Sequence, residues 1–346
     1  MKSFELHRIK DAAARRAAFD GCEPKIWWET GFIPTLVIAD ADIAAEAMRR
    51  ADFIIPDHRA LVDDIKRRYH RPFDYLSKTM DILPVFLEGE RHAAVRKLLG
   101  QFLSAKLREL EPRLPDIVRA HLDRLPRTGD ADLVSQLLVP FTREVFSELA
   151  ERELTDQVMD MTLGRIFEAT QTVSSLGRLD NWFERLFSFL DAGPPGDERF
   201  ICQLCCLVFG VDNVLSTLAE NMVAAFQQAN DTIPARLPAY PVETMVSVTH
   251  RKAVAPAVIA GHPVQPSDLI RIHIEPFGYS ADKTVNAALF GAGRHACVGK
   301  QISLSIWRHL SEQFNDRKIR GTITDYQSES THTFNFVRTL KVSIQP

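Results

Sequence analysis

Apolar residues recur at intervals of three and four positions over most of the first two thirds of the chain. This spacing matches one face of an α-helix and predicts helices over residues 42–54, 92–110, 114–125 and 132–151. The β-like stretches are fewer and scattered, at residues 35–40, 253–261, 268–274 and 333–344. The pattern therefore predicts a mainly α fold with small β-sheets and no regular alternation of strands and helices.

A long apolar helix is predicted near the middle of the chain. Residues 201–222 keep helical spacing of apolar positions over about six turns. Gly210 interrupts this helix at a cost of about 1 kcal/mol relative to alanine, which indicates close approach of another group. Asp212, Ser216 and Glu220 share one face, and their spacing alone fits a functional face and a solvated face equally well.

Composition narrows the possible partners. The chain has 346 residues, 45% hydrophobic and 25% charged, with a net charge of −3. These values fit a globular protein with a large core, and they argue against binding to nucleic acid or to an anionic membrane. The N-terminal residues contain no apolar signal region, and the apolar run at 201–211 is shorter than the roughly 20 residues of a membrane span. We expect a cytoplasmic protein.

The cysteines form an odd and unevenly spaced set, which argues against a disulfide framework and indicates a reducing compartment. They are Cys22, Cys202, Cys205, Cys206 and Cys297. Cys202 and Cys205 form a C-x-x-C pair, but the pair lies in an apolar helical run and has no second pair. Packing as small hydrophobic side chains is therefore favoured over a metal or redox site.

The stretch FGAGRHACVG, residues 290–299, surrounds Cys297 with glycines. Ile302 and Ile306 follow at helical spacing, so Cys297 is expected where a loop enters a helix and the helix dipole stabilises a thiolate. The glycines let the backbone lie against a planar group and point amide N–H groups at the sulfur. His295 could reach a carboxylate at the edge of that group. These are the requirements of a haem iron bound by a cysteine thiolate.

These residues carry a resemblance to a known family. FGAGRHACVG is similar to the cytochrome P450 signature F-G-x-G-x-H/R-x-C-x-G at every fixed position. HAAVRKLLGQF resembles the family's C-helix, whose histidine and arginine, here His92 and Arg96, hold haem propionates. The central helix resembles the I-helix, with Gly210 and Asp212 in its A-G-x-(D/E)-T element, and FNFVRTLKVSIQP resembles the closing strands. The resemblance implies one domain over residues 1–346 of the soluble bacterial type.

The same resemblance implies haem b (iron protoporphyrin IX) between the central helix and the cysteine loop with its following helix. It makes Cys297 the iron ligand and places Asp212 and Asn213 in catalysis. It assigns the haem contacts to His92, Arg96, Gly210, Phe290, Gly291, Gly293, His295 and Gly299.

The chain departs from the family's haem-side pattern in three places. The K-helix motif E-x-x-R has Glu243 but Val246 in place of its arginine, so Glu243 is expected to lose its ion-pair partner. The network around the haem-side loop must then be made otherwise. The following meander is compressed to residues 275–289, and Ala257 stands near the position of a further propionate arginine.

The oxygen-activating element also differs. The family's acid–alcohol pair serves as a proton relay, but here Asn213 follows Asp212, so the hydroxyl is missing. Asparagine can still hydrogen-bond a water or a substrate group, and Ser216 or Thr217 one turn later could supply a hydroxyl. Either an altered relay or a different chemistry is expected.

The leading interpretation is a haem-thiolate monooxygenase that oxidises a small or medium organic molecule in bacterial specialised metabolism, with electrons from a ferredoxin and its reductase. One alternative is a P450-like enzyme that uses peroxide or catalyses dehydration, rearrangement or bond coupling. Another is a non-catalytic haem-binding accessory protein. Trp182, Phe183, Phe187 and Phe189 could line a substrate pocket, although a packed helix face is favoured.

Overall fold

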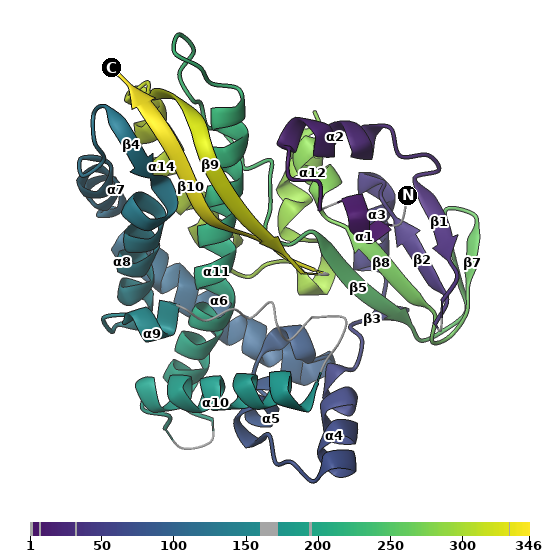
Figure 1. The fold of residues 1–346 in the computed structure, drawn as a ribbon. Coiled ribbons are helices and arrows are strands. Elements are labelled where there is room, and N and C mark those ends of the chain that lie inside the picture. Colours follow the sequence, from purple (N-terminus) through teal and green to yellow (C-terminus); the bar gives the residue numbers. More distant parts are fainter. Residues whose placement is uncertain (1–2, 7, 32, 160–171, 194–195, 332) are drawn as a thin grey trace.

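The structure is a computed structural model that describes residues 3–6, 8–31, 33–159, 172–193, 196–331 and 333–346. A large helical part and a smaller part rich in strands lie side by side (Figure 1). The helices are α1 (Ser3–Leu6), α2 (Ala12–Asp20), α3 (Ala41–Arg49), α4 (His58–Tyr69), α5 (Asp74–Met80), α6 (Gly89–Leu110), α7 (Leu114–Leu122), α8 (Val139–Ala150), α9 (Asp156–Met159), α10 (Val173–Phe189), α11 (Glu198–Gln227), α12 (Glu275–Tyr279), α13 (Lys283–Ala287) and α14 (Lys300–Asp316).

The strands of the described residues form a five-stranded, a three-stranded and a two-stranded sheet. They are β1 (Ile26–Glu29), β2 (Thr35–Ile38), β3 (Phe53–Ile54), β4 (Gly129–Asp132), β5 (Val248–Ala253), β6 (Ala257–Ile259), β7 (His262–Val264), β8 (Leu269–His273), β9 (Arg320–Ser330) and β10 (Asn335–Gln345). The five-stranded sheet has the order β1-β2-β8-β5-β3, and only its β2–β8 pair is parallel. The order of the three-stranded sheet is β4-β10-β9.

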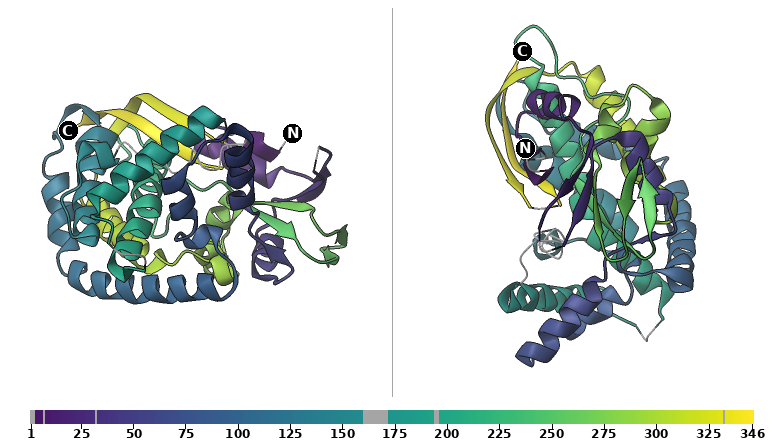
Figure 2. Two further views of the ribbon diagram at one scale, coloured as in Figure 1. Left: turned by 90° about the horizontal axis from the view of Figure 1, so that it is seen from below. Right: turned by 90° about the vertical axis from the view of Figure 1, so that its right-hand side faces the viewer.

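Helix α11 runs through the middle of the helical part and organises its packing. The Asp197 carboxylate caps its first turn by accepting from the amides of Arg199 and Phe200 at 3.0 and 3.1 Å. Helix α8 packs along α11, and the β9–β10 hairpin covers another side of it (Figure 2). The helix is long and apolar enough to cross a membrane, but 61% of its most apolar window is buried inside the protein, as in a core helix.

The predicted fold class is confirmed, and the predicted helices over residues 42–54, 92–110, 114–125 and 132–151 correspond to α3, α6, α7 and α8. The differences arise where strands pair across long sequence distances. Residues 53–54, at the end of a predicted helix, form β3 because they pair with β5. The β-like stretch 253–261 divides, since its first residue ends β5 and only residues 257–259 form β6 in a hairpin with β7. Strands β1, β4, β7 and β9 and all but the last residue of β5 lie outside the β-like stretches that the sequence predicts.

The chain between α11 and β5 contains no helix. Residues 228–247 are irregular apart from a single bridge between Val246 and Phe334. The E-x-x-R comparison therefore concerns a segment without helical geometry, in which a residue three positions after Glu243 does not share its face. Whatever pairs with Glu243 has to come from another element.

Candidate haem site

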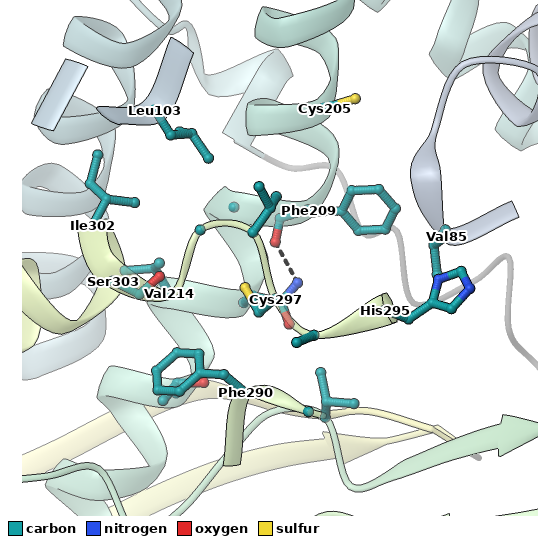
Figure 3. Close-up of a pocket in the computed structure, with 18 of the residues that line it drawn as sticks. Val85, Leu103, Cys205, Phe209, Val214, Phe290, His295, Cys297, Ile302 and Ser303 are labelled. Carbon is teal, nitrogen blue, oxygen red and sulfur yellow. Dashed lines mark hydrogen bonds between the residues drawn. The ribbon is translucent and has the colours of Figure 1, made fainter. Parts of the chain in front are cut away.

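A cavity of about 350 Å³ lies between α11, α14 and the cysteine loop. Helices α6 and α8 and the chain from Pro241 to Arg251 complete its wall. Figure 3 shows Cys297 on its loop below α11, with Phe209 and Val214 projecting from that helix and Ile302 from α14. The lining is mainly apolar, so water gains few hydrogen bonds there and an apolar ligand is favoured.

The cysteine loop is a compact turn held by its own backbone. The Cys297 amide donates to the Phe290 carbonyl at 2.7 Å, which closes the loop over the intervening residues. Gly291 and Gly293 have φ angles of +78° and +71°, which side-chain-bearing residues rarely adopt. A Cβ on Gly293 would also lie 2.5 Å from the Met48 carbonyl at the end of α3. The glycines therefore serve the turn and its packing on α3.

Cys297 stands two residues before the N-cap of α14, as the sequence predicts. Its side chain is accessible from the cavity, although protein surrounds the cavity. Burial raises the pKa of its thiol, while the Gly299 amide and the positive charges of Arg96 and Lys300 act in the opposite direction. A group that coordinates the sulfur would reverse the balance, because a metal ion stabilises the thiolate directly.

One end of the cavity gathers basic groups that lack an acid. Arg96 and Arg251 line the cavity, and neither has a carboxylate partner among the described residues. Arg251 is 3% exposed and donates only to the Thr249 hydroxyl and the His250 carbonyl, at 3.1 and 2.8 Å. Burial lowers its pKa to about 10. A buried and a half-buried cation that lack a carboxylate partner call for an anionic ligand.

Two histidines lie beside these arginines. The rings of His92 and His295 stack with centroids 4.1 Å apart, and the buried Nε2 of His92 has no hydrogen-bond partner. His295 Nε2 lies 3.2 Å from Glu88, which also pairs with Arg294 at 3.1 Å. Burial lowers the pKa of His295 to about 4, so its ring is neutral at pH 7 and donates to Glu88. His92 thus offers a free nitrogen, whereas one nitrogen of His295 is already engaged.

The face of α11 toward the cavity carries Gly210, Asn213 and Thr217. A Cβ on Gly210 would overlap the Phe146 ring of α8, which confirms the predicted close approach of another group. The Asn213 side-chain amide donates to the Phe209 carbonyl one turn earlier. Asp212 is buried but does not line the cavity. Of the two candidate hydroxyls, Thr217 lines the cavity and Ser216 does not.

No protein-family model matches the chain. Cytochrome P450 105C1 from Streptomyces sp is 25% identical over 261 residues, which cover 63% of this chain and 68% of that relative. The structure of CalO2 matches with a TM-score of 0.76 and 15% identity over 100% of this chain and 99% of that one. Myxobacterial CYP267B1 with myristic acid matches with a TM-score of 0.74 and 15% identity over 99% and 97%. P450BioI with an acyl-carrying acyl carrier protein matches at 0.73 and 12% over 95% and 98%.

The chain has the cytochrome P450 fold. Together with the cysteine-loop motif, the relative and the structures support membership of the cytochrome P450 family. The fold is shared with P450-like monooxygenases of microbial secondary metabolism.

The structure resolves two of the sequence-based expectations. Val246 supplies no cation to Glu243, and the pair is made otherwise, because Arg15 of α2 pairs with Glu243 and Tyr279 donates to it at 3.0 Å. Ala257 does not stand at the site, because it lies in the β6–β7 hairpin away from the cavity lining. The buried arginine at that end of the cavity is Arg251 on β5. Sequence reasoning missed Arg15 and Arg251 because neither belongs to a recognisable local motif.

Core packing, the interpretation that the sequence favours, is confirmed for two groups of residues. Trp182, Phe183 and Phe187 are buried in the main hydrophobic core and do not line the cavity, nor does Phe189. Cys202 is likewise a core residue, and no metal-binding cluster occurs among the described residues. Cys205 packs in the core too, but it also lines the cavity together with Cys206.

The residues around the cavity fit a haem. A thiol opens onto an apolar cavity at the start of α14, which suits a soft ligand to iron. Arg96 and Arg251 supply two cations, and His92 supplies a buried nitrogen without a partner. Those three groups at one end of an otherwise apolar cavity match a flat apolar molecule with carboxylates at one edge.

Proposed function

We propose that this P450-like chain is a haem-thiolate monooxygenase that oxidises a small or medium organic molecule. The observation that carries the proposal is the Cys297 side chain, which opens onto an apolar cavity directly below α11. Its loop satisfies every fixed position of the family signature, and the two comparisons by sequence and by structure point to the same family.

Different residues of the chain would bind the iron and the propionates of haem b. Cys297 would ligate the iron, while Arg96, Arg251 and His92 would hold the propionates. Glu88 fixes His295 and Arg294, and so keeps the cysteine loop against α6. The bound haem supplies oxidising chemistry that no amino-acid side chain offers.

On the α11 side, the residues shape the part of the cavity that faces Cys297. The Asn213 amide holds the Phe209 carbonyl, so Asn213 and Gly210 shape the turn of α11 that faces Cys297. Asn213 and Thr217 can hold a proton donor or a water at this face, since both line the cavity. The apolar wall excludes bulk water and favours an apolar substrate. Structures with myristic acid and with an acyl carrier protein in P450 relatives support that class.

A second candidate is a P450-like enzyme with non-standard chemistry, such as peroxide-driven oxidation, dehydration, rearrangement or bond coupling. The observation that favours it is Asn213, which follows Asp212 where the family element has a hydroxyl, and whose amide donates to the Phe209 carbonyl. An amide is a poor proton relay because it does not ionise near neutral pH, whereas reactions that begin with peroxide or need no oxygen activation do not require that relay.

The partners of the proposed enzyme are its small-molecule substrate and an electron donor of the ferredoxin type with its reductase. We place it in the cytoplasm, because its family resemblance is to the soluble bacterial P450 proteins. The described residues show no cluster that would bind a second metal.

A carbon monoxide difference spectrum of the dithionite-reduced protein tests the proposal. The wild type should show the Soret band of a thiolate-ligated haem, and Cys297→Ser should lose that band while still binding haem more weakly. Turnover with ferredoxin, its reductase and NAD(P)H would then favour monooxygenation, and turnover only with peroxide or without a donor would favour the second candidate. Absence of haem from the wild type, or a band that survives in Cys297→Ser, would contradict both.

A further inference from the structure

Arg15 of α2 is a buried cation that belongs to no sequence motif. Its side chain contacts α11, α12 and the chain around Glu243. Its side chain is 4% exposed. Its Nη2 pairs with Glu243 and lies 3.2 Å from Glu220 of α11, and its Nε donates to the Tyr279 hydroxyl of α12 at 3.3 Å. Its Nη1 donates to the Ile9 carbonyl at 2.9 Å, which anchors the chain just before α2. All donor-bearing nitrogens of the guanidinium are therefore engaged.

Glu243 belongs to a piece of the cavity wall. Pro241, Thr244 and Val246 line the cavity, and the chain between them has no regular structure. Irregular backbone gains no hydrogen bonds from its own helix or strand, so other elements have to hold it. Residues 241–246 are named the wall segment below.

The wall segment is fastened to α11 by side chains. The side-chain oxygen of Asn221, Oδ1, accepts from the backbone amides of Val242 and Glu243 at 2.9 and 3.2 Å. The side-chain Nδ2 of Asn221 donates to the Glu243 backbone carbonyl at 2.9 Å. The Thr217 hydroxyl oxygen accepts from the Met245 amide at 3.3 Å. These bonds set the path of the backbone but leave the Glu243 carboxylate to be neutralised.

The carboxylate of Glu243 is fully buried, so its charge requires a nearby cation. Arg15 supplies it, and Tyr279 adds a hydrogen bond at 3.0 Å. The wall segment also meets α12 at close range, because a Cβ on Gly278 would overlap the Val242 carbonyl. Helix α2, the wall segment and α12 are therefore held together by one charge.

We propose that Arg15 is a positioning residue of the site, which fixes the wall segment against the cavity through Glu243. The link to haem rests on the proposed function, but the link between α2 and the wall is made by this chain alone. Helix α2 is thereby part of the site, although it does not touch the cavity. Loss of the Arg15 cation should release the wall segment and loosen whatever the cavity binds.

The first test measures hydrogen exchange of the wall segment in the full-length protein as purified. Arg15→Met removes the charge at similar length, Glu243→Gln removes the carboxylate charge, and Lys10→Met is the control at an exposed cation just before α2. We expect exchange of the Val242, Glu243 and Met245 amides to become at least about 10-fold faster in the first two variants and to stay unchanged in the control.

The double variant Arg15→Met/Glu243→Gln decides whether the two residues act through each other. If they do, the double variant exchanges no faster than the faster single variant. Arg15→Lys keeps the charge and should recover part of the protection, and it replaces Arg15→Met if that protein does not fold. Unchanged exchange in the wall segment, or additive effects in the double variant, would overturn the proposal even if thermal stability falls.

The second test measures haem loss and the thiolate band of the carbon monoxide complex at a temperature well below unfolding. Faster haem loss in Arg15→Met and Glu243→Gln, with the control unchanged, is the expected result. A purely structural role would lower the unfolding temperature without changing either reading in the folded protein, and would count against the proposal. A wild type without haem would refute the proposed function, while the exchange experiment would still decide the role of Arg15.

Discussion

The imidazole rings of His92 and His295 stack with their centroids 4.1 Å apart and their planes at 37°. His92 belongs to α6 and His295 to the cysteine loop, so this contact holds the loop against the helix. One ring also leaves a buried nitrogen without a partner, which is the Nε2 of His92. His92 therefore has two roles, because its ring packs against His295 and its Nε2 is available to a ligand. A substitution can remove one role and keep the other.

His92→Phe should keep the ring contact and lose the nitrogen. We expect the free energy of unfolding of the apoprotein to stay within about 1 kcal/mol of the wild-type value, because an aromatic ring of similar size fills the same space. Haem affinity should fall by about 10-fold, the loss of one hydrogen bond to a charged group. His92→Ala should lose both stability and affinity. Thermal unfolding of the apoprotein and transfer of haem to an acceptor protein give the two values. Equal haem affinity in His92→Phe and wild type would contradict a propionate contact.

Arg251→Met should move apoprotein stability and haem affinity in opposite directions. The guanidinium is buried without a carboxylate partner, and burial lowers its pKa to about 10, so its charge is unfavourable until an anion binds. Replacing an uncompensated buried charge by an apolar side chain should stabilise the apoprotein by about 1–3 kcal/mol. Haem affinity should fall about 10- to 100-fold. Urea unfolding and haem titration measure the two effects, with the exposed Arg49→Met as the control. A fall in both quantities would show that Arg251 serves the fold alone.

Gly210→Ala should destabilise the protein despite the better helix propensity of alanine. The added methyl group would overlap the Phe146 ring, and overpacking of this kind costs about 1–3 kcal/mol, more than the roughly 1 kcal/mol gained in the helix. Phe146→Leu in the same chain should recover most of the loss by making room. Chemical denaturation of the two single variants and the double variant checks this. Additive losses in the double variant would mean that the ring is not the source of the strain.

Glu220 should make the protein less stable as the pH rises through neutrality. Burial is the main cause that raises its pKa to about 7, the nearby Glu243 also raises it, and Arg15 opposes the shift. A carboxyl whose folded pKa exceeds the unfolded value of 4.5 favours folding in its protonated form. Its contribution is complete below about pH 4.5 and is lost as the pH rises through about 7, by up to about 3 kcal/mol.

Glu220→Gln should therefore flatten the dependence of unfolding free energy on pH between about 4.5 and 7. The variant should be more stable than wild type at pH 8, where wild-type Glu220 is charged. The other ionisable groups that face Glu220 are Arg15, Glu243, Glu275 and Tyr326, and they remain in the variant. Urea unfolding at several pH values measures the slope. An unchanged slope would show that Glu220 stays ionised throughout this range.

The helices near the site could be predicted because their information is local. The apolar spacing of α6, α8 and α11 marks the buried face of each helix, since that face has to meet the core wherever the helix lies. Gly210 also indicated the close approach of another group, but the sequence could not identify that group as Phe146. The identity of a packing partner depends on the path of the chain between the two residues.

The irregular wall segment shows the limit of pattern matching. Glu243 resembles the acidic residue of a helical E-x-x-R motif, and its arginine was sought three positions later at Val246. The segment forms no helix, so that spacing has no geometric meaning there. The carboxylate is instead neutralised by Arg15, 228 residues away in the chain. An ion pair requires only proximity in space, and sequence separation does not constrain it.

The sequence by itself determined the mainly α class, the position of the central helix and the place of Cys297 in a glycine-rich loop before a helix. It could do so because these depend on residues within a few turns of one another, as in the ten positions around Cys297. Only the tertiary structure decided which cations surround the cavity. Arg251 lies on a strand placed by pairing with β3 and β8, and Arg15 lies on a helix placed by packing on α11 and α12. A buried charge is stabilised by whichever opposite charge or polar group the fold brings near it. That partner can lie far away in the sequence, as Glu243 does from Arg15, so no contiguous stretch of the chain identifies it.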